Sequence, residues 1–463
     1  MLAALLAAGC TLAPRPAHPD LPTPTRYPSV AASPPGASSA RIGWRTFFAD
    51  PELTALIERA LANNRDLRAA AARIEQARAV VRIRGADLAP QISGSLDMAK
   101  IGVPDDLAML LRDDTLTTYA GLLQTRWEID LFGRLRSLRA AALEQYLASA
   151  EARRGLATSL IAQVAAGYLA DREYAERLAL ARDTLANRER ALHLLERRYQ
   201  VGSGSKVDVT QAETLRTQAA GEIQGLELAR AQNLNALALL LGAPIDASSL
   251  SHGLAQVGLD QPIPAGLPSD LLANRPDIAA AEHQLRGAEA NIGAARAAFF
   301  PNISLTAIAG SSSDDLDGLF AKGTGLWLFR PTLSLPIFTA GKLRANLRGS
   351  EAARDELLAA YEKSIQLGFR DVADALAQRR WLADQLATTE ALVATLVERA
   401  RLSQLRYDAG RAAYLEVLDA ERDRFSAEQR RVQLQRAWLA SGVALYAALG
   451  GGFPETEPQG RIP

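Results

Sequence analysis

The chain has 463 residues, and its 52 Lys and Arg balance 52 Asp and Glu, so the formal net charge is zero. A balanced chain offers no basic face, which argues against nucleic acid as the main partner. Aromatic residues make up only 6%, and Ala, Leu and Arg abound, which is typical of long, partly exposed helices. No run of about 18 apolar residues exists, so any passage through a membrane requires β-strands.

The N-terminal residues resemble a bacterial lipoprotein signal. The single cysteine, Cys10, follows Leu6-Ala7-Ala8-Gly9 and an apolar run that begins at Met1. These positions match a lipobox, so we predict a signal peptide over residues 1–9 and acylation of Cys10. No Lys or Arg precedes the apolar run, which indicates a truncated signal. A lipid on Cys10 would anchor the chain without spanning the membrane, and the alternative is an ordinary thiol at a frayed end.

Residues 10–41 are predicted to form an extended, lipid-anchored segment, because eight prolines fall between Pro14 and Pro35. Asp50 followed by Pro51 is a helix-start signal. Helical patterning runs from there to about Asp87, and Pro90 ends it.

Two alternating segments follow, over residues 92–98 and 119–131, with a polar loop between them. In the second, Leu123 and Trp127 fall on one face, while Arg126 and Glu128 fall on the other. A strand of roughly a dozen residues is long enough to cross a bilayer at a tilt. The half-buried strand of a soluble protein would show the same alternation.

A helical pattern then runs from about Leu135 to Tyr199, which corresponds to roughly 100 Å. Its apolar seam keeps a spacing of seven residues, which predicts helices packed side by side as in a coiled coil. Asp171 interrupts this seam, and Arg379 interrupts the seam of a second long helix at the equivalent place. A shorter helix is predicted to end at about Leu241.

Each of the two long helical patterns ends in a similar turn sequence. Arg198-Tyr199-Gln200-Val201-Gly202 and Arg406-Tyr407-Asp408-Ala409-Gly410 lie 208 residues apart. Gly tolerates a positive φ, so each copy is predicted to be a tight helix–turn–helix tip. The second half also repeats the strand start, since Pro301-Asn302-Ile303-Ser304 matches Pro90-Gln91-Ile92-Ser93. We therefore predict a first structural repeat at 42–241, a linker at 242–267, a second repeat at 268–450 and a disordered tail at 451–463.

Four strands per chain cannot close a wide sheet on themselves. They would leave two open edges, which lipid does not tolerate. If the chain spans a membrane, it must therefore oligomerise.

The whole chain resembles the TolC-type outer-membrane efflux channels, in the OprM/NodT-like lipoprotein branch. The resemblance rests on the lipobox, both tips, Trp127-Glu128-Ile129-Asp130-Leu131-Phe132-Gly133-Arg134 and Asn274-Arg275-Pro276-Asp277. It implies a mainly α fold with a β-barrel part, in which three chains share a twelve-stranded barrel that continues into a twelve-helix periplasmic tunnel. It also implies a passive duct in the outer membrane, served by a periplasmic adaptor (membrane fusion) protein and an inner-membrane RND-type pump.

Few motifs suggest catalysis, so the sequence predicts no enzyme activity and no cofactor. The four histidines are scattered and show no metal-ligand spacing. Ser203 and Ser205 lie in a Gly-rich turn without a nearby histidine and are interpreted as turn residues.

The resemblance assigns roles to residues near the tips. Asp208 and Tyr407 occupy positions where the family ties neighbouring tip helices together, and Gly202 and Gly410 mark the predicted adaptor-docking tips. Leu415, Glu416 and Asp419 are predicted to form the periplasmic gate. Glu416 and Asp419 are three residues apart on one helical face, so a trimer would gather six carboxylates that favour cations. The alternatives are that Asp208 only starts a helix, that Tyr407 only ends a heptad seam, and that the acids face solvent or pair with Arg411 or Arg422.

Other function classes remain open at the level of sequence. A periplasmic coiled-coil tether would explain the heptads and the lipid, but not the paired, Trp-bearing strands. An envelope enzyme lacks any supporting constellation of residues. Within the channel class, an outlet for type I protein secretion or for metal efflux is the nearest alternative.

Overall fold

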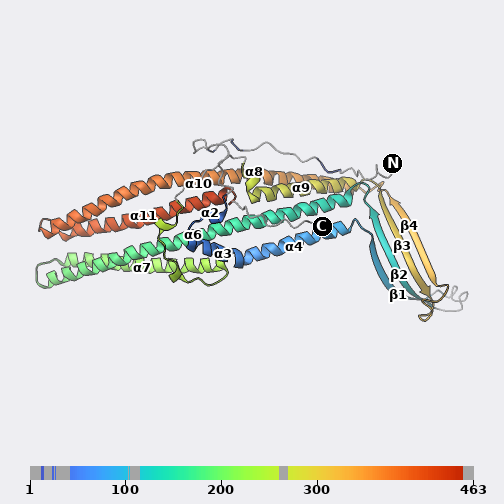
Figure 1. Ribbon diagram of the computed structural model, residues 1–463, viewed down its shortest axis with the longest axis horizontal. Helices are drawn as coiled ribbons and strands as arrows, with labels where there is room; N and C mark the ends of the chain where they lie inside the picture. Colours follow the sequence, from blue (N-terminus) through green and yellow to red (C-terminus); the bar gives the residue numbers. More distant parts are fainter. Residues whose placement is uncertain are drawn as a thin grey trace. The chain divides into compact units, whose positions relative to one another are not determined.

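The structure is a computed structural model that describes residues 12–14, 23–24, 27, 42–102, 104, 115–259 and 270–451. Cys10 and residues 452–463 of the predicted tail lie outside these residues. The described chain is mainly helical and contains one four-stranded sheet (Figure 1). None of its helices is both long and apolar enough to cross a membrane.

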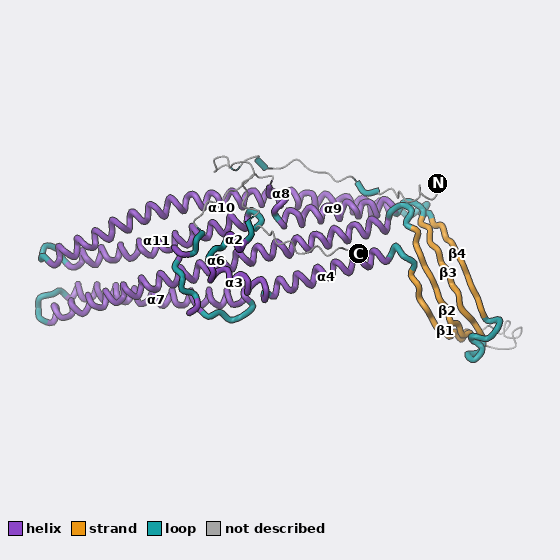
Figure 2. The backbone as a smooth tube through the Cα atoms, viewed as in Figure 1, coloured by secondary structure: helices purple, strands orange, loops and turns teal. Residues whose placement is uncertain are grey.

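The chain divides into two compact units, and each unit combines segments from both halves of the sequence. Unit 1 comprises Met1–Asp20, Ala72–Ala150 and Ala280–Glu362, and unit 2 comprises Leu21–Ala71, Glu151–Ala279 and Lys363–Pro463. Figure 2 separates helices, strands and loops along the backbone. The first half contains α2 (Trp44–Phe47), α3 (Pro51–Asn63), α4 (Arg65–Ala86), β1 (Gln91–Gly102), β2 (Thr115–Ile129), α6 (Arg134–Gln200) and α7 (Lys206–Leu241).

The second half repeats this order after two short 3₁₀ helices. Each half places two strands between a helix and a helix of 67 residues, α6 or α10, and follows the long helix with a shorter one. The elements are η2 (Ala247–Ser249), η3 (Leu254–Gln256), α8 (Asp270–Asn274), α9 (Pro276–Ala297), β3 (Asn302–Ser313), β4 (Gly325–Ser334), α10 (Lys342–Asp408) and α11 (Tyr414–Ala448). The predicted mainly α, internally duplicated protomer with four strands is therefore confirmed.

The sheet in unit 1 is antiparallel, with the strand order β1-β2-β3-β4. Its register pairs Leu123 with Gly94 and Ala309, and pairs Ala309 with Trp327. Because paired residues point to the same side of a sheet, most of the large apolar side chains of the four strands share one face. Leu122, Ile308 and Leu328 are exceptions on the other face. The alternation read from the sequence thus describes the sheet correctly, although β1 and β2 are longer than the alternating segments.

This apolar face is uncovered in the single chain. Leu96 on β1 and Trp327 on β4 are 79% and 81% exposed. A face of this kind is far too apolar for water and matches the lipid-facing side of a membrane sheet. The outer strands β1 and β4 each have only one neighbour, so their outer edges carry unpaired backbone groups.

The helical pattern predicted from Asp50 to Asp87 is interrupted, which corrects the expectation of one continuous helix. Asn64 adopts an extended ψ of 131° and ends α3. Its Oδ1 accepts hydrogen bonds from the backbone amides of Asp66 and Leu67, which start α4, and its Nδ2 donates to the Leu240 carbonyl at 3.0 Å. One side chain therefore ends a helix, starts the next and ties both to α7. The predicted helix start at Asp50 is confirmed, since its side chain accepts from the amides of Glu52 and Leu53.

Both halves end in the same way. Gly242 follows α7 with φ 62°, and Gly450 follows α11 with φ 102°. A Cβ at Gly242 would lie 2.6 Å from the Asn63 carbonyl oxygen, and a Cβ at Gly450 would lie 2.4 Å from that of Asn274. Close backbone approach at a positive φ leaves glycine as the only fitting residue at both places.

The core of unit 2 includes the segment predicted as a linker. Leu250, Leu254, Val257 and Leu259 are buried in the same apolar cluster as Tyr168 of α6 and Tyr446 of α11. The described part of the segment, residues 242–259 (the inter-repeat segment), therefore packs on the helices of unit 2. Proline spacing alone could not indicate this, because burial depends on which helices the segment crosses.

Candidate functional site

The two tips in unit 2 are built by the same hydrogen bonds. In the first, the amides of Gly202 and Ser203 donate to the carbonyls of Tyr199 and Arg198 at 3.0 and 2.9 Å. In the second, the amides of Gly410 and Arg411 donate to the carbonyls of Tyr407 and Arg406 at 2.8 Å each. Gly202 has φ 78° and Gly410 has φ 69°. The repeated sequence thus folds into two equivalent turns, each with an exposed glycine at its apex.

Tyr407 links the ends of the two long helices. Its hydroxyl accepts a hydrogen bond from Nη1 of Arg198, whose guanidinium carbon also lies 5.2 Å from the centroid of the Tyr407 ring. The ring makes an edge contact with Tyr414, at 4.8 Å between centroids, so α6, α10 and α11 meet at this residue. Asp208 lies in the first turn of α7 and has no hydrogen bond or ion pair within the described residues. The predicted role of Asp208 in linking neighbouring tip helices remains a prediction.

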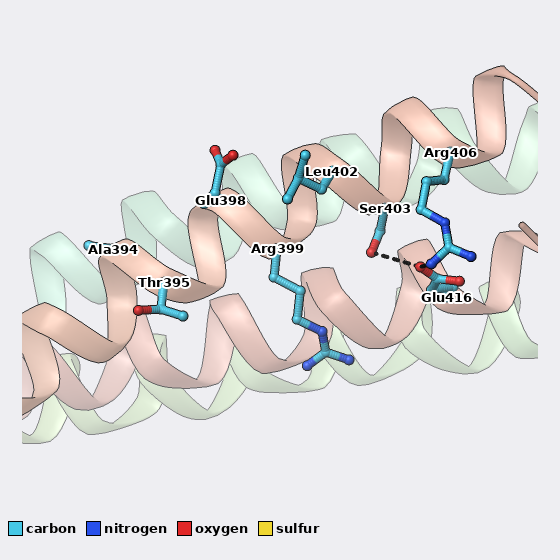
Figure 3. Close-up of a pocket in the computed structure, with 8 residues that line it drawn as sticks. All are labelled: Ala394, Thr395, Glu398, Arg399, Leu402, Ser403, Arg406 and Glu416. Atoms are coloured by element: carbon cyan, nitrogen blue, oxygen red, sulfur yellow. Dashed lines mark hydrogen bonds and ion pairs between the residues drawn. The ribbon is translucent and has the colours of Figure 1, made fainter.

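The predicted gate residues lie at the start of α11, next to arginines of the same chain, and Figure 3 shows Glu416 beside Arg406. Glu416 accepts from Arg406 Nη1 at 2.7 Å and from Ser403 Oγ at 3.5 Å. Asp419 lies 3.1 Å from Arg422. Leu415 is exposed. The pairing of Asp419 with Arg422 matches the alternative raised from the sequence, whereas Glu416 pairs with Arg406 and not with Arg411.

Glu416 and Arg406 line an open groove of about 720 Å³ between α10 and the start of α11, and Asp419 and Arg422 form a separate pair on α11. Both members of each pair are more than a third exposed. Exposed pairs of this kind contribute only about 0–1 kcal/mol, so the two arginines offset the charge of Glu416 and Asp419 without holding these carboxylates rigidly. Glu416 also stands in the first turn of α11, where the helix dipole favours a negative charge.

The residue that interrupts the first heptad seam is the centre of a buried ion-pair cluster. Asp171 is fully buried and bonds to Arg172 and, at 2.8 Å, to Arg230 of α7. Two residues on, Glu173 bonds to Arg177 at 3.0 Å and to Arg436 of α11 at 2.8 Å. The sequence indicated that Asp171 interrupts the heptad seam, but it could not identify the arginines that pair with Asp171.

The inter-repeat segment is fastened to the helices by charged side chains. Arg172 donates to the Leu250 carbonyl at 2.5 Å, and Arg379 donates to the Leu259 carbonyl at 3.3 Å. Arg379 also lies over the ring of Trp438 at 4.8 Å. Arg379 therefore holds this segment directly, whereas Asp171 acts on it only through its ion pair with Arg172.

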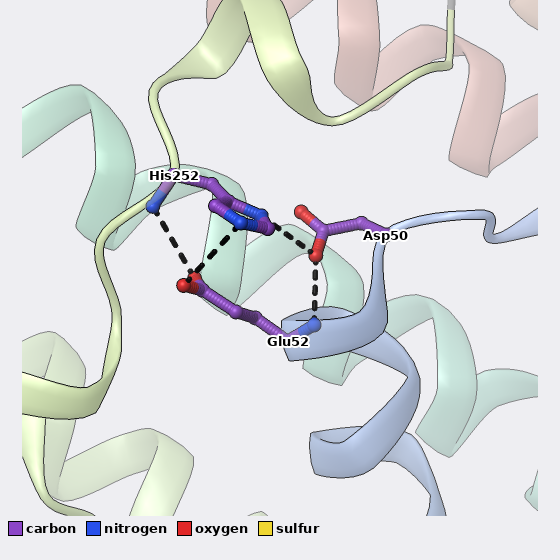
Figure 4. A group of neighbouring side chains, drawn as sticks. All are labelled: Asp50, Glu52 and His252. Atoms are coloured by element: carbon purple, nitrogen blue, oxygen red, sulfur yellow. Dashed lines mark hydrogen bonds and ion pairs between the residues drawn. The ribbon is translucent and has the colours of Figure 1, made fainter.

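One cluster at this segment has the residue types of a metal site. His252 Nδ1 lies 3.2 Å from Asp50 Oδ1, and His252 Nε2 lies 3.8 Å from Glu52 Oε1 (Figure 4). The ligand atoms of the three residues lie within 4.8 Å of one another. The sequence did not single out this group, because its members come together only through packing of the inter-repeat segment on α3.

The hydrogen bonds of this cluster assign it a structural role. Tyr168 donates to both carboxylates at 2.8 and 2.9 Å, and the amide and hydroxyl of Ser251 donate to Glu52. Burial raises the pKa of the Glu52 carboxyl, but the hydrogen bonds from Ser251, Tyr168 and the His252 amide outweigh burial and leave that pKa below its usual value. A metal ion would have to displace these donors, so the cluster is better explained as a clasp between α3, α6 and the inter-repeat segment.

Comparison with known proteins identifies the class of this molecule. The family model described as "Outer membrane efflux protein" matches residues 56–243 and 267–451. The solvent efflux pump outer membrane protein SrpC of Pseudomonas putida is 44% identical over 466 residues, which cover 98% of this chain and 97% of SrpC. The antibiotic efflux pump outer membrane protein ArpC of Pseudomonas putida is 42% identical over 463 residues, which cover 98% of this chain and 95% of ArpC.

The fold agrees with solved channel structures. The open state of the Neisseria gonorrhoeae MtrE outer membrane channel matches with a TM-score of 0.87 and 36% identity, covering 96% of this chain and 98% of that one. The molecule is therefore an outer-membrane channel and not an enzyme. It belongs to the outer membrane efflux protein family, as the channel component of an efflux pump, and the resemblance to TolC-type channels of the OprM/NodT-like branch is confirmed.

Proposed function

We propose that three copies of the chain assemble into one passive duct. The uncovered apolar face and the open edges of β1 and β4 support this assembly, because β1 of one copy can pair with β4 of the next and leave no edge in lipid. Twelve strands then form one closed sheet, and the twelve long helical segments continue the duct into the periplasm. The free energy for transport comes from the inner-membrane pump.

The partners of this duct are a periplasmic adaptor and an inner-membrane RND-type pump. The observation that carries this proposal is the pair of equivalent glycine tips, which present short exposed turns at the ends of helices of 67 residues. Two homologues are described as components of solvent and antibiotic efflux pumps. The cargo is accordingly small apolar or amphipathic molecules, such as organic solvents and drugs.

Efflux in cells tests this proposal. A host that lacks its own outer-membrane efflux channel but keeps pump and adaptor is complemented with this chain, and drug susceptibility is measured. The wild type is expected to restore resistance, and Gly410→Trp is expected to abolish it, because a large side chain at the tip blocks the adaptor.

Gly410→Asn is the matched control, since asparagine tolerates a positive φ better than other residues with side chains and is expected to keep resistance. Membrane fractions must contain equal amounts of trimer for all variants. Loss of insertion or trimers in Gly410→Trp would mean that the tip is a folding element and not a docking surface.

A lipid on Cys10 is expected to fix the N-terminus at the membrane surface. The Leu12 carbonyl accepts from Arg296 at 3.2 Å, near the end of α9 and six residues before β3. Cys10 precedes Leu12 by two residues in the sequence, and we expect its lipid to act as the membrane anchor.

Replacement Cys10→Ser is expected to abolish incorporation of labelled palmitate while trimers remain, because the strands and not the lipid span the membrane. Palmitate labelling of the variant equal to that of the wild type would contradict the lipid anchor.

A further inference from the structure

A cavity of about 400 Å³ lies between four helices of unit 2, and it shares no lining residue with the groove at Glu416. Its lining comes from α6, α7, α10 and α11, and its apolar part includes Leu194, Leu215 and Val417. Arg188, Tyr414 and Glu421 add polar groups to the same lining. Polar and apolar side chains contribute about equally to this lining. A cavity of this size that combines an apolar wall with converging polar groups is a candidate small-molecule site.

Arg188 is the unusual member of this lining. Three arginines are buried within the described chain, and two of them have carboxylate partners: Arg172 bonds to Asp171, and Arg275 bonds to Asp277 at 2.6 Å and to Asp371 at 3.2 Å. Arg188, at 8% exposure, has no carboxylate oxygen within 4.0 Å in the described residues. A buried cation without a counter-ion is costly.

The contacts of Arg188 leave its charge only partly compensated. Nη1 donates to the Leu215 carbonyl at 2.6 Å, and the guanidinium carbon lies 5.4 Å from the ring of Phe425. Burial lowers the pKa of Arg188, and the more distant charge of Glu421 opposes this effect only in part. An anion in the cavity would supply the missing partner.

We propose that this cavity binds a small amphipathic carboxylate, with its carboxylate on Arg188 and its apolar body along Leu194, Leu215 and Val417. The planar guanidinium matches a carboxylate well. Glu421 on the same lining repels a second negative charge and so limits the site to monoanions. Burial raises the pKa of Tyr414 to about 12, which keeps its hydroxyl protonated and available as a donor.

The proposed binding at this cavity does not depend on the tripartite assembly. A bound molecule contacts residues of the α6–α7 pair and of the α10–α11 pair together, and Val417 is the direct neighbour of Glu416. Occupancy therefore joins two helix pairs next to the gate.

Calorimetric titration of the purified protein in phosphatidylcholine nanodiscs tests the proposal, with empty nanodiscs as background. The probes are 8-phenyloctanoate and its neutral counterpart 8-phenyloctanamide. The acid is expected to bind more tightly than the amide. Arg188→Gln is expected to weaken binding of the acid by about 10- to 100-fold, the usual effect of a charge-assisted hydrogen bond, and to leave the amide unchanged.

Two further variants separate charge from packing. Glu421→Gln removes the competing carboxylate and is expected to tighten binding of the acid, whereas Leu194→Trp fills the cavity and is expected to abolish binding of both probes. Arg182→Gln, an exposed arginine on the same helix paired with Glu227, serves as the matched control and is expected to match the wild type. Circular dichroism verifies that each variant is folded. Equal affinities for acid and amide, absence of binding, or an acid affinity unchanged in folded Arg188→Gln would overturn the proposal.

Discussion

Asp171→Ala is expected to lower the free energy of unfolding by about 3–5 kcal/mol, the usual cost of breaking a buried ion pair from one side. Asp171 is fully buried and holds Arg172 and Arg230, so its removal leaves two cations without their partner. Arg172 also holds the Leu250 carbonyl, and the change should therefore loosen the inter-repeat segment as well. Urea unfolding followed by circular dichroism measures the effect.

The control for this prediction is Asp183→Ala, an exposed aspartate on the same helix. Substitutions at such surface positions usually change stability by less than about 0.5 kcal/mol. If Asp171→Ala unfolds at the same urea concentration as Asp183→Ala, the buried cluster does not stabilise the helical unit.

The second large effect is expected on ion selectivity, from substitutions at the predicted gate. Glu416→Ala/Asp419→Ala is expected to reduce cation preference and to weaken block by divalent cations in single-channel recordings, because the variant removes six carboxylates from a trimer. The arginine pairs refine this expectation. Arg406→Ala removes the positive charge beside Glu416 and is therefore expected to strengthen cation preference. The ion pair itself is exposed and contributes about 1 kcal/mol or less.

Glu390→Ala, an exposed acid on α10 away from the gate, is the matched control and is expected to conduct as the wild type does. Wild-type selectivity and wild-type block in the Glu416→Ala/Asp419→Ala variant would show that these carboxylates do not line the pore.

Local sequence features predicted much of the fold. The duplicated Arg-Tyr-x-x-Gly segments gave two tips with equivalent hydrogen bonds, because the glycine at 202 and at 410 controls the turn locally. The alternation of apolar and polar residues around Trp127 correctly predicted the apolar face of the sheet, because successive side chains of a strand point to opposite faces. The interruption of α3 and α4 at Asn64 was missed, because its side chain bonds to Leu240 far along the chain.

The partners of charged residues were the least predictable part of the site. Asp171 and Arg379 were visible in the sequence as interruptions of the heptad seams. The sequence could not indicate that Arg379 bonds to the inter-repeat segment or that Asp171 pairs with Arg172, which does the same. Arg406 rather than Arg411 pairs with Glu416, a choice decided by helix packing. Arg188 carried no signal at all, because nothing in its neighbourhood in the sequence indicates that it is buried.

The central claim is that this chain forms a channel that its tip helices keep nearly closed. Conductance of the purified wild type in planar bilayers, compared with Tyr407→Phe, tests it most directly, because the variant removes the hydroxyl that accepts from Arg198. The account predicts small, cation-preferring steps for the wild type and a larger resting conductance for Tyr407→Phe, and likewise for Asp208→Asn. Absence of conductance steps in the wild type and in both variants would contradict it.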